Sequence, residues 1–274
     1  MEGRSLTRDR GIGGSGDRGP LGSVPPGEAI AFPRSRVPAF PVLSVIVPTY
    51  NERDALPALL ARLDGVRRTL PLEVVIVDDA SPDGTGSMGE TLARRTAMPV
   101  TIIHRPRKSG LASAAIDGAA AAHGRIVTVM DADLSHPPEL LPSLVAAIDA
   151  GADVAIASRY VPDGGIDDWP LARRILSVAA TALARTVLGL PVRDPLSGFF
   201  AARTSLLTGG AYYGVGYKLL VEVLVRHPGR IVEVPYRFTD RRRGHSKLTL
   251  AEVRAFFVLL AGLWRYQHRM SRPE

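Results

Sequence analysis

Arg-Ile-Val-Thr-Val-Met-Asp-Ala-Asp-Leu-Ser-His-Pro-Pro, residues 125–138, is the stretch that best predicts the fold of this chain. Its apolar part, Ile126–Met130, is rich in β-branched residues and predicts a buried strand. Because charge is costly to bury, Asp131 and Asp133 are expected at or just beyond the carboxyl end of that strand. Residues i and i+2 of an extended segment point to the same side, so the two carboxylates can converge on one cation. Carboxylate oxygens favour Mg²⁺ or Mn²⁺ shared with substrate phosphates, and the alternative is an acidic turn.

The sequence on either side alternates short apolar runs with helical patterns. This alternation predicts an α/β fold with an open, mainly parallel sheet, right-handed crossovers and helices on both faces. In such sheets ligands bind at the carboxyl ends of the strands, where Asp131 and Asp133 are expected. The expected strands are 43–48, 73–79, 100–104, 126–130, 153–157 and 231–236.

Length and composition are those of a globular protein of one large domain or two small ones. The chain has 274 residues, 46% hydrophobic and 22% charged, and its lack of cysteine excludes disulfides and thiolate metal sites. Residues 1–40 are rich in Gly, Pro and Arg, which predicts a disordered extension without a secretory signal. The expected organisation is this extension, a folded domain at 41–248, and an amphipathic helix with its tail at 249–274.

The net charge of +7 is concentrated at the C-terminal end, where residues 236–274 hold nine Arg and Lys against three Asp and Glu. A basic balance suits nucleic acid, anionic lipid or phosphorylated substrates. The aromatic and basic residues do not interleave as in an RNA-binding strand, so a nucleic-acid-binding protein is the weaker hypothesis.

Two other predicted strand ends carry polar motifs: Val-Pro-Thr-Tyr-Asn-Glu at 47–52 and Val-Asp-Asp-Ala-Ser-Pro-Asp-Gly-Thr at 77–85. Together with 130–138 they resemble the inverting family 2 glycosyltransferases, which have a GT-A fold that binds nucleotide sugars. Later segments resemble dolichol- or polyprenol-phosphate mannose synthases in particular. These segments are Ala157–Tyr160, Trp169-Pro170 with Arg173 and Arg174, Asp194-Pro195 with Ser197–Phe199, Gly216–Lys218, and Arg241-x-x-Gly244-x-Ser246-Lys247. Eight motifs in one order make the resemblance specific.

The resemblance implies roles for individual residues. It implies metal binding by Asp131, Asp133 and Ser135, with Ser135 in a position where relatives carry Gln or Ser. It assigns catalytic roles to Asp133, Arg159, Arg241 and Lys247, the three cations contacting donor and acceptor phosphates. The substrate-binding residues that it implies are Pro48, Tyr50, Glu52, Val77, Asp79, Asp131, Ala132, Asp133, Arg159, Arg173, Arg241 and Lys247.

The function that the resemblance implies is inverting transfer of a mannosyl group from GDP-mannose to a polyprenyl (dolichyl-type) monophosphate, with Mg²⁺ or Mn²⁺. One alternative is a related enzyme that uses UDP-glucose, UDP-GlcNAc or a hydroxyl acceptor, for which a carboxylate base would be needed. Another is a catalytically silent nucleotide-sugar binder, against which the intact Asp131, Asp133 and Lys247 argue.

The C-terminal segment predicts a helix with an apolar stripe. Its uninterrupted apolar run, Ala255–Trp264, is ten residues long. A membrane span needs about 20, so this helix either packs on the domain or lies in the membrane interface. Because the acceptor that the resemblance implies is a lipid, we expect peripheral binding to the cytoplasmic face of a membrane. A membrane-anchoring partner protein is a further expectation.

Overall fold

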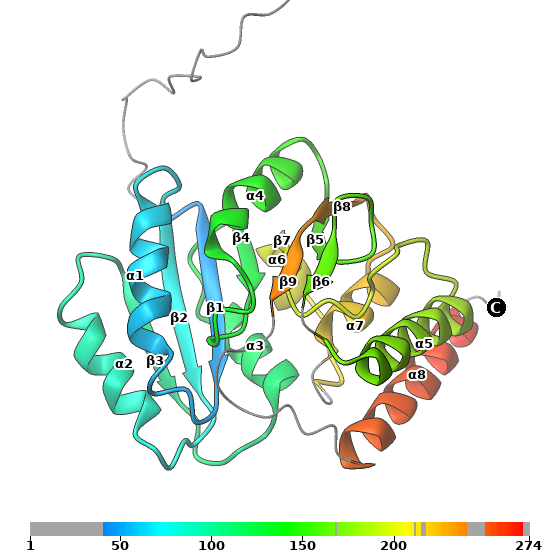
Figure 1. Ribbon diagram of the computed structural model, residues 1–274, viewed down its shortest axis with the longest axis horizontal. Helices are drawn as coiled ribbons and strands as arrows, with labels where there is room; N and C mark the ends of the chain where they lie inside the picture. The colour runs from blue at the N-terminus through cyan, green and yellow to red at the C-terminus, as the bar shows by residue number, and fades with distance from the viewer. Residues whose placement is uncertain (1–40, 168, 211, 215–217, 240–249, 271–274) are drawn as a thin grey trace, which may run out of the picture. The chain divides into compact units, whose positions relative to one another are not determined.

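The computed structural model describes residues 41–167, 169–210, 212–214, 218–239 and 250–270, which lie in one compact unit running from Val37 to Glu274. Its centre is a seven-stranded sheet of order β3-β2-β1-β4-β7-β5-β8, with a second sheet of β6 and β9 (Figure 1). The predicted 1–40 extension lies outside the described residues. The strands are β1 (Leu43–Thr49), β2 (Leu72–Asp78), β3 (Val100–His104), β4 (Ile126–Val129), β5 (Val154–Ser158), β6 (Gly165–Asp167), β7 (Phe200–Arg203), β8 (Ile231–Pro235) and β9 (Arg237–Thr239).

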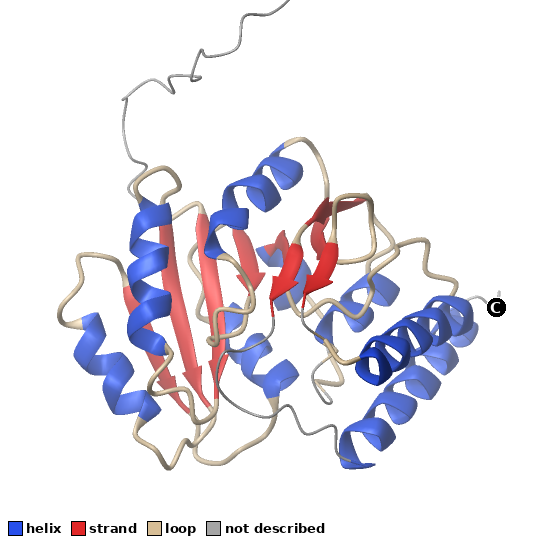
Figure 2. Cartoon of the chain, in the orientation of Figure 1, coloured by secondary structure: helices blue, strands red, loops and turns tan. Residues whose placement is uncertain are grey.

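Helices alternate with the strands along the first half of the chain, as the sequence pattern predicts (Figure 2). Gly189 follows the helix Leu171–Leu188 directly, and its φ of 61° is a left-handed conformation that glycine adopts without a steric penalty. The helices are α1 (Leu56–Arg67), α2 (Thr85–Ala93), α3 (Leu111–Ala120), the 3₁₀ helix η1 (Pro138–Leu140), α4 (Leu141–Asp149), α5 (Leu171–Leu188), α6 (Thr204–Thr208), α7 (Leu219–Arg226) and α8 (Leu250–Met270).

The carboxyl ends of β1, β2 and β4 share one edge of the sheet. β1 pairs in parallel with both neighbours, with Thr49 opposite Asp78 and Ile46 opposite Val129. The segments that follow these three strands therefore begin side by side. The predicted open, mainly parallel sheet is confirmed, and a ligand site at this edge stays a prediction.

One strand departs from the parallel pattern. β7 lies between β4 and β5 and is antiparallel to both. This strand is not among the apolar runs expected as strands from the sequence, because its four residues, Phe200–Arg203, are too short a run to show a periodic pattern. β7 returns the chain across the sheet and so separates β4 from β5.

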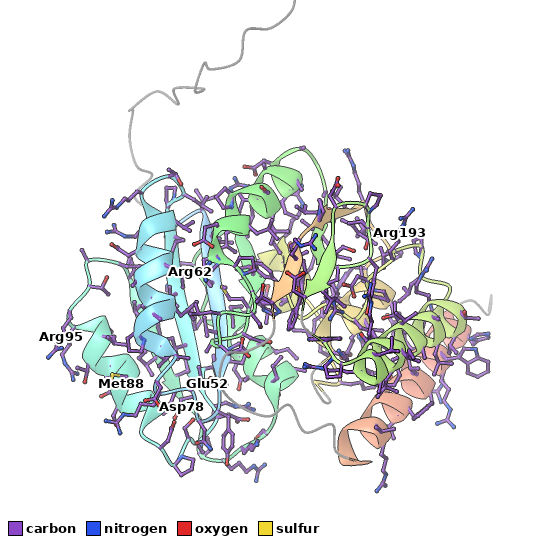
Figure 3. All side chains as sticks on the ribbon, viewed as in Figure 1. Glu52, Arg62, Asp78, Met88, Arg95 and Arg193 are labelled. Carbon is purple, nitrogen blue, oxygen red and sulfur yellow. The ribbon has the colours of Figure 1, made fainter. Side chains whose placement is uncertain are left out.

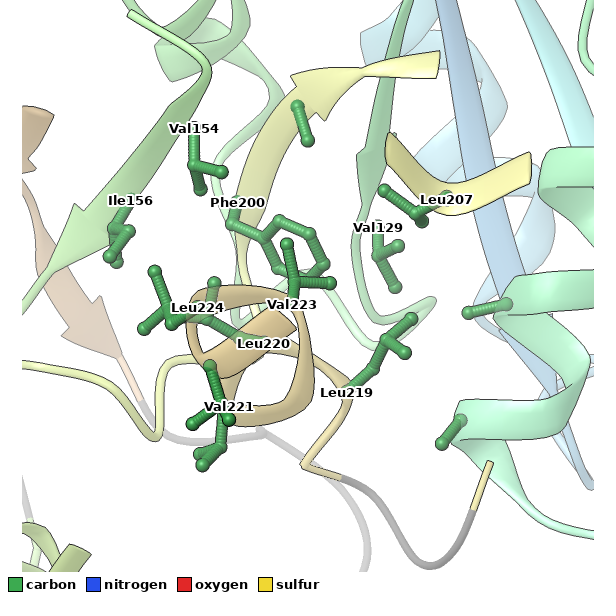
Figure 4. Packing of buried hydrophobic residues seen from close by; sticks show 14 of the residues in the cluster. Val129, Val154, Ile156, Phe200, Leu207, Leu219, Leu220, Val221, Val223 and Leu224 are labelled. Carbon is green, nitrogen blue, oxygen red and sulfur yellow. The ribbon is translucent and has the colours of Figure 1, made fainter. Parts of the chain in front are cut away.

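Two hydrophobic clusters form the core, one on each face of the sheet. Alternate residues of a strand serve opposite faces, so in β1 Val45 and Val47 join the cluster under α1 and α4, while Ile46 joins the cluster under α3 and α7. Figure 4 shows the second cluster around the Phe200 ring of β7. The prediction of helices on both faces is confirmed.

Candidate active site

The loops after β1 and β2 are joined by hydrogen bonds. The backbone N–H of Glu52 donates to Thr85 Oγ1 at 2.9 Å, and the N–H of Arg53 donates to Asp83 Oδ2 at 3.2 Å. Figure 3 labels Glu52 and Asp78 at this end of the sheet. Burial alone would raise the pKa of Asp83, but the hydrogen bonds from Thr85 and Arg53 outweigh it and lower that pKa. The two loops thus form one ordered wall of the site.

Tyr50 presents its ring at this wall. The side chain is 38% exposed, and Lys108 Nζ lies 3.5 Å from the ring centroid. A cation at this distance is held by the quadrupole of the ring, and a nucleobase could stack on the same kind of surface. Sequence reasoning selected Tyr50 but passed over Lys108, which nothing in the sequence links to Tyr50.

Asp79 is buried and its carboxylate organises the segment that leads into α3. Oδ1 accepts hydrogen bonds from Arg105 Nη1 at 3.0 Å and from the N–H of Ser109 at 2.9 Å, and Oδ2 accepts from the N–H of Gly110 at 2.8 Å. These bonds fix the 105–110 loop beside the β2 end. A contact of Asp79 with the donor nucleoside stays a prediction, as do the contacts of Pro48 and Val77, which are buried in their strands.

The segment after β4 forms a tight turn around the two aspartates. Asp133 Oδ1 accepts a hydrogen bond from the N–H of Ser135 at 3.0 Å, and Leu134 between them has a φ of 65°. Such a turn is typical of aspartate, whose side chain bonds to the backbone two residues later. Ala132 is 2% exposed and lies in the core, so its role in substrate binding rests on its backbone.

This turn fits the divalent cation that the sequence predicts. Ser135 Oγ is buried and has no hydrogen-bond partner within the described part of the chain, which is a cost unless a ligand or water satisfies it. No group of three or more His, Cys, Asp or Glu among the described residues could hold a metal alone. Mg²⁺ and Mn²⁺ sites of nucleotide enzymes use one or two carboxylates and substrate phosphates, which is the set that Asp131, Asp133 and a diphosphate would supply.

Arg159 follows β5 and is held by a buried carboxylate. Its Nη2 lies 2.7 Å from Asp194 Oδ1, its Nε lies 2.8 Å from Oδ2, and the exposed fractions of the two side chains are 8% and 0%. Burial alone would lower the pKa of Arg159, but the hydrogen bonds and charge of Asp194 raise it instead. Glu233 in β8 fixes Asp194 by accepting its backbone N–H at 3.0 Å. A phosphate contact by Arg159 stays a prediction.

Trp169 brings Arg159 and Arg173 together. The guanidinium carbons lie 5.9 Å and 4.0 Å from the centroid of its ring.

Burial raises the pKa of Tyr236, and the charges of Asp194 and Asp131 add to this effect against the charge of Arg159. The charges of Asp131 and of the Arg159–Asp194 pair thus all act on Tyr236.

The predicted site residues therefore fall into three sets. One set lines the β1 and β2 ends, a second forms the Asp131–Ser135 turn, and a third surrounds Trp169. Arg241 and Lys247 lie outside the described residues. The contacts that sequence reasoning missed are those of Arg105, Lys108, Asp194 and Tyr236, all of which join segments far apart in the chain.

A seven-stranded, mainly parallel sheet with helices on both faces and acidic turns at its carboxyl edge defines an α/β fold of the GT-A type. Glucosyl-3-phosphoglycerate synthase from Mycobacterium tuberculosis, solved with Mn²⁺, UDP-glucose and phosphoglyceric acid, superposes with a TM-score of 0.62 at 21% identity, covering 85% of this chain and 81% of that one. The sequence profile of Glycosyl transferase family 2 matches residues 44–209. The chain belongs to this family.

Curated relatives are similar over most of the chain. The dolichol-phosphate mannosyltransferase of Pyrococcus furiosus is 44% identical over 235 residues, which are 84% of this chain and 66% of that protein. The polyprenol monophosphomannose synthase of Mycolicibacterium smegmatis is 37% identical over 240 residues, 84% of this chain and 89% of that one. The undecaprenyl-phosphate mannosyltransferase of Micrococcus luteus is 40% identical over 214 residues, 74% of this chain and 86% of that one.

Proposed function

We propose that this chain transfers a mannosyl group from GDP-mannose to a polyprenyl monophosphate of the dolichyl type, with inversion at the anomeric carbon. The observation that carries the proposal is the Asp131–Ser135 turn at the carboxyl edge, where two aspartates stand beside a buried hydroxyl without a described partner. The proposal is supported by the relatives at 37% to 44% identity, which are named as mannosyltransferases of dolichol, polyprenol and undecaprenyl phosphates.

The chemistry is a single displacement. An oxygen of the acceptor phosphate attacks the anomeric carbon from the face opposite the diphosphate, the glycosidic C–O bond breaks, and GDP leaves with the electron pair. The second pKa of a phosphate monoester is about 6, so the attacking oxygen is already anionic at neutral pH and no general base is needed. Positioning and neutralisation of charge then account for the rate.

In this proposal the side chains of the site bind and orient the two phosphate-bearing substrates. Asp131 and Asp133 would hold Mg²⁺ or Mn²⁺ with the diphosphate, and Ser135 would complete the site directly or through water. The bound ion supplies electrostatic stabilisation of the leaving group. Tyr50, Glu52 and Asp79 would bind the nucleoside. Arg159, Arg173, Arg241 and Lys247 would contact the phosphates.

A transfer panel tests the proposal. Purified protein is incubated with polyprenyl phosphate, Mg²⁺ and one radiolabelled donor at a time, GDP-mannose, UDP-glucose or UDP-GlcNAc, and label is counted in the chloroform phase. We expect label from GDP-mannose alone. Transfer of label from a UDP sugar would contradict GDP-mannose as the donor. Label found in an added oligosaccharide but not in lipid would contradict the lipid phosphate as the acceptor.

A membrane surface is the second part of the proposal. In the described part of the chain no helix is long and apolar enough to cross a membrane. α5 and α8 are in contact (Figure 1), and both carry large apolar side chains that are exposed. We define the apolar face of these helices as Leu171, Ile175, Leu176, Val178, Leu183, Val187, Phe257, Val258 and Trp264, whose exposed fractions run from 36% to 72%.

The charges around the apolar face suit an anionic lipid surface. α5 contains no Asp or Glu, and its Arg174 and Arg185 are exposed, as are Arg254, Arg265 and Arg269 of α8. Exposed apolar side chains gathered on neighbouring helices can mark an interaction site, and exposed arginines on the same helices favour anionic lipid. We therefore propose peripheral binding to the cytoplasmic face of a membrane, where the lipid phosphate meets the site.

A further inference from the structure

His136 lies under the Asp131–Ser135 turn in a stack of aromatic rings. The residue is 2% exposed, and its ring is 5.0 Å from that of Phe199, with 14° between the planes. Tyr236 and Phe238 meet it edge-on at 6.3 Å. A Cβ placed on Gly198 would lie 3.3 Å from His136 Cε1, so the ring is closely confined. The imidazole is thus a fixed part of the core that reaches the edge of the site.

Both nitrogens of this ring face Asp131. Nδ1 accepts a hydrogen bond from the backbone N–H of Asp131 at 2.9 Å, so this nitrogen carries no proton. Nε2 lies 3.9 Å from Asp131 Oδ2. One buried ring therefore fixes the backbone of Asp131 by a hydrogen bond and faces its carboxylate from within the core.

We propose that His136 is a positioning residue, which sets the backbone of Asp131 so that its carboxylate is preorganised for the divalent cation. This inference rests on the proposed function, since it concerns the cation assigned there to Asp131 and Asp133. Hydrogen bonds hold both ends of the turn: the N–H of Ser135 donates to Asp133, and the N–H of Asp131 donates to His136. Sequence spacing does not predict the second of these bonds. Groups that orient metal ligands typically change metal affinity or activity by about 10- to 100-fold when removed.

Two substitutions of His136 separate this role from packing. His136→Phe keeps an aromatic ring against Phe199 but removes the acceptor, whereas His136→Asn loses the ring but places an amide oxygen where Nδ1 accepts. Phe238→Leu is the control, because it removes a ring from the stack and leaves the hydrogen bond. Mn²⁺ binding to each full-length protein is measured by electron paramagnetic resonance in the presence of GDP, and thermal unfolding midpoints are recorded.

We expect His136→Phe to weaken Mn²⁺ binding by about 10- to 100-fold, His136→Asn to stay within about threefold of wild type, and Phe238→Leu to unfold earlier with unchanged Mn²⁺ affinity. Unchanged affinity in His136→Phe, or an equal loss in Phe238→Leu, overturns the positioning role. Because this assay contains neither sugar nor lipid, its outcome is separate from that of the transfer panel, whose failure would overturn the proposed donor or acceptor instead.

Discussion

Arg159 and Asp194 form an ion pair with almost no contact with solvent, since their exposed fractions are 8% and 0%. Removing one partner of a buried pair leaves the other charge without compensation. We expect Asp194→Asn to lower the free energy of unfolding by about 3 kcal/mol, the lower end of the range for broken buried pairs, because the amide keeps one acceptor. Urea unfolding followed by circular dichroism measures it.

An exposed ion pair provides the comparison for that prediction. Arg237 and Asp167 lie 3.2 Å apart, but 66% and 37% of their side chains are exposed. Asp167→Asn should therefore change the free energy of unfolding by less than about 1 kcal/mol. If the two aspartate variants lost equal stability, burial would not be what makes the Asp194 pair important.

Asp133 carries the sharpest prediction about activity. Loss of its carboxylate in Asp133→Ala removes one of the two negative charges proposed to hold the cation. Because metal stabilisation of a leaving group is worth several kcal/mol and each 1.4 kcal/mol is tenfold, turnover should fall at least about 100-fold. Transfer of radiolabel measures it, EDTA should abolish wild-type activity, and Mg²⁺ or Mn²⁺ should restore it. A folded Asp133→Ala protein with full activity would contradict the metal assignment.

Glu73 lies near the start of β2, at the end of the sheet opposite the candidate active site, and connects β1 and the segment before β4 by hydrogen bonds. It is 4% exposed and accepts hydrogen bonds from Ser44 Oγ at 2.6 Å and from the N–H of His123 at 2.6 Å. Burial alone would raise the pKa of Glu73, but the hydrogen bonds from Ser44 and His123 and the charge of His123 lower it below 4.5. The ionised form is therefore favoured in the folded state.

This lowered pKa predicts how stability depends on pH. A carboxyl group with a lower pKa in the folded state stabilises the protein above its unfolded value, and that contribution is lost as the pH falls through the folded value. Glu73→Gln should be less stable than wild type at pH 7, and the difference should shrink below about pH 4.5. Urea midpoints of both proteins between pH 3 and pH 7 give the answer, and a constant difference would mean that Glu73 acts by shape alone.

The basic segment 241–247 lies outside the described residues, so its proposed role rests on the sequence alone. The resemblance places Arg241 and Lys247 on substrate phosphates. Loss of one charge-assisted contact costs on the order of 1.5–3 kcal/mol, so Lys247→Ala should lower turnover about ten- to a hundredfold with unchanged unfolding. The control is Arg193→Ala, which removes an exposed arginine from another loop. If both variants kept wild-type kinetics, Lys247 would not contact a substrate phosphate.

The sequence predicted elements better than it predicted the partners of their side chains. Strands such as β1 and β2 are mainly apolar runs that end in polar motifs, so the local sequence pattern suffices to place the strands and their carboxyl ends. Other features depend on how separate segments pack or how a turn folds. They are the direction of β7, the ion pair of Arg159 with Asp194, and the hydrogen bond between Asp131 and His136. Periodicity carries no information about such contacts. The resemblance implies a phosphate contact for Arg159, but it did not identify Asp194 as the buried partner of this arginine.

At the scale of the whole molecule, the two faces of the sheet are covered differently. α1 and α4 bury their apolar residues in one cluster, whereas α5 and α8 bury only part of theirs in the other. In α8, Leu259, Leu260 and Leu263 are buried while Phe257, Val258 and Trp264 are exposed. The predicted apolar stripe of α8 is thus divided between the core and the surface. α5 adds exposed apolar side chains that the sequence pattern did not single out.

The last prediction concerns this apolar face, which we propose to meet anionic lipid. Each cation near such a surface contributes about 1 kcal/mol, so Arg185→Gln on α5 should weaken binding to phosphatidylserine-containing vesicles roughly fivefold. Arg94→Gln, directly after α2, removes a charge from a side chain that is 70% exposed and should leave binding unchanged. The double variant Leu171→Gln/Ile175→Gln should reduce binding further, because it removes two apolar side chains that are 72% and 60% exposed. High salt should weaken wild-type binding, since it screens the attraction.

Vesicle co-sedimentation measures binding of the three variants and of wild type at low and high salt. Equal sedimentation of every variant, or none for wild type, would mean that the apolar face binds a partner protein instead.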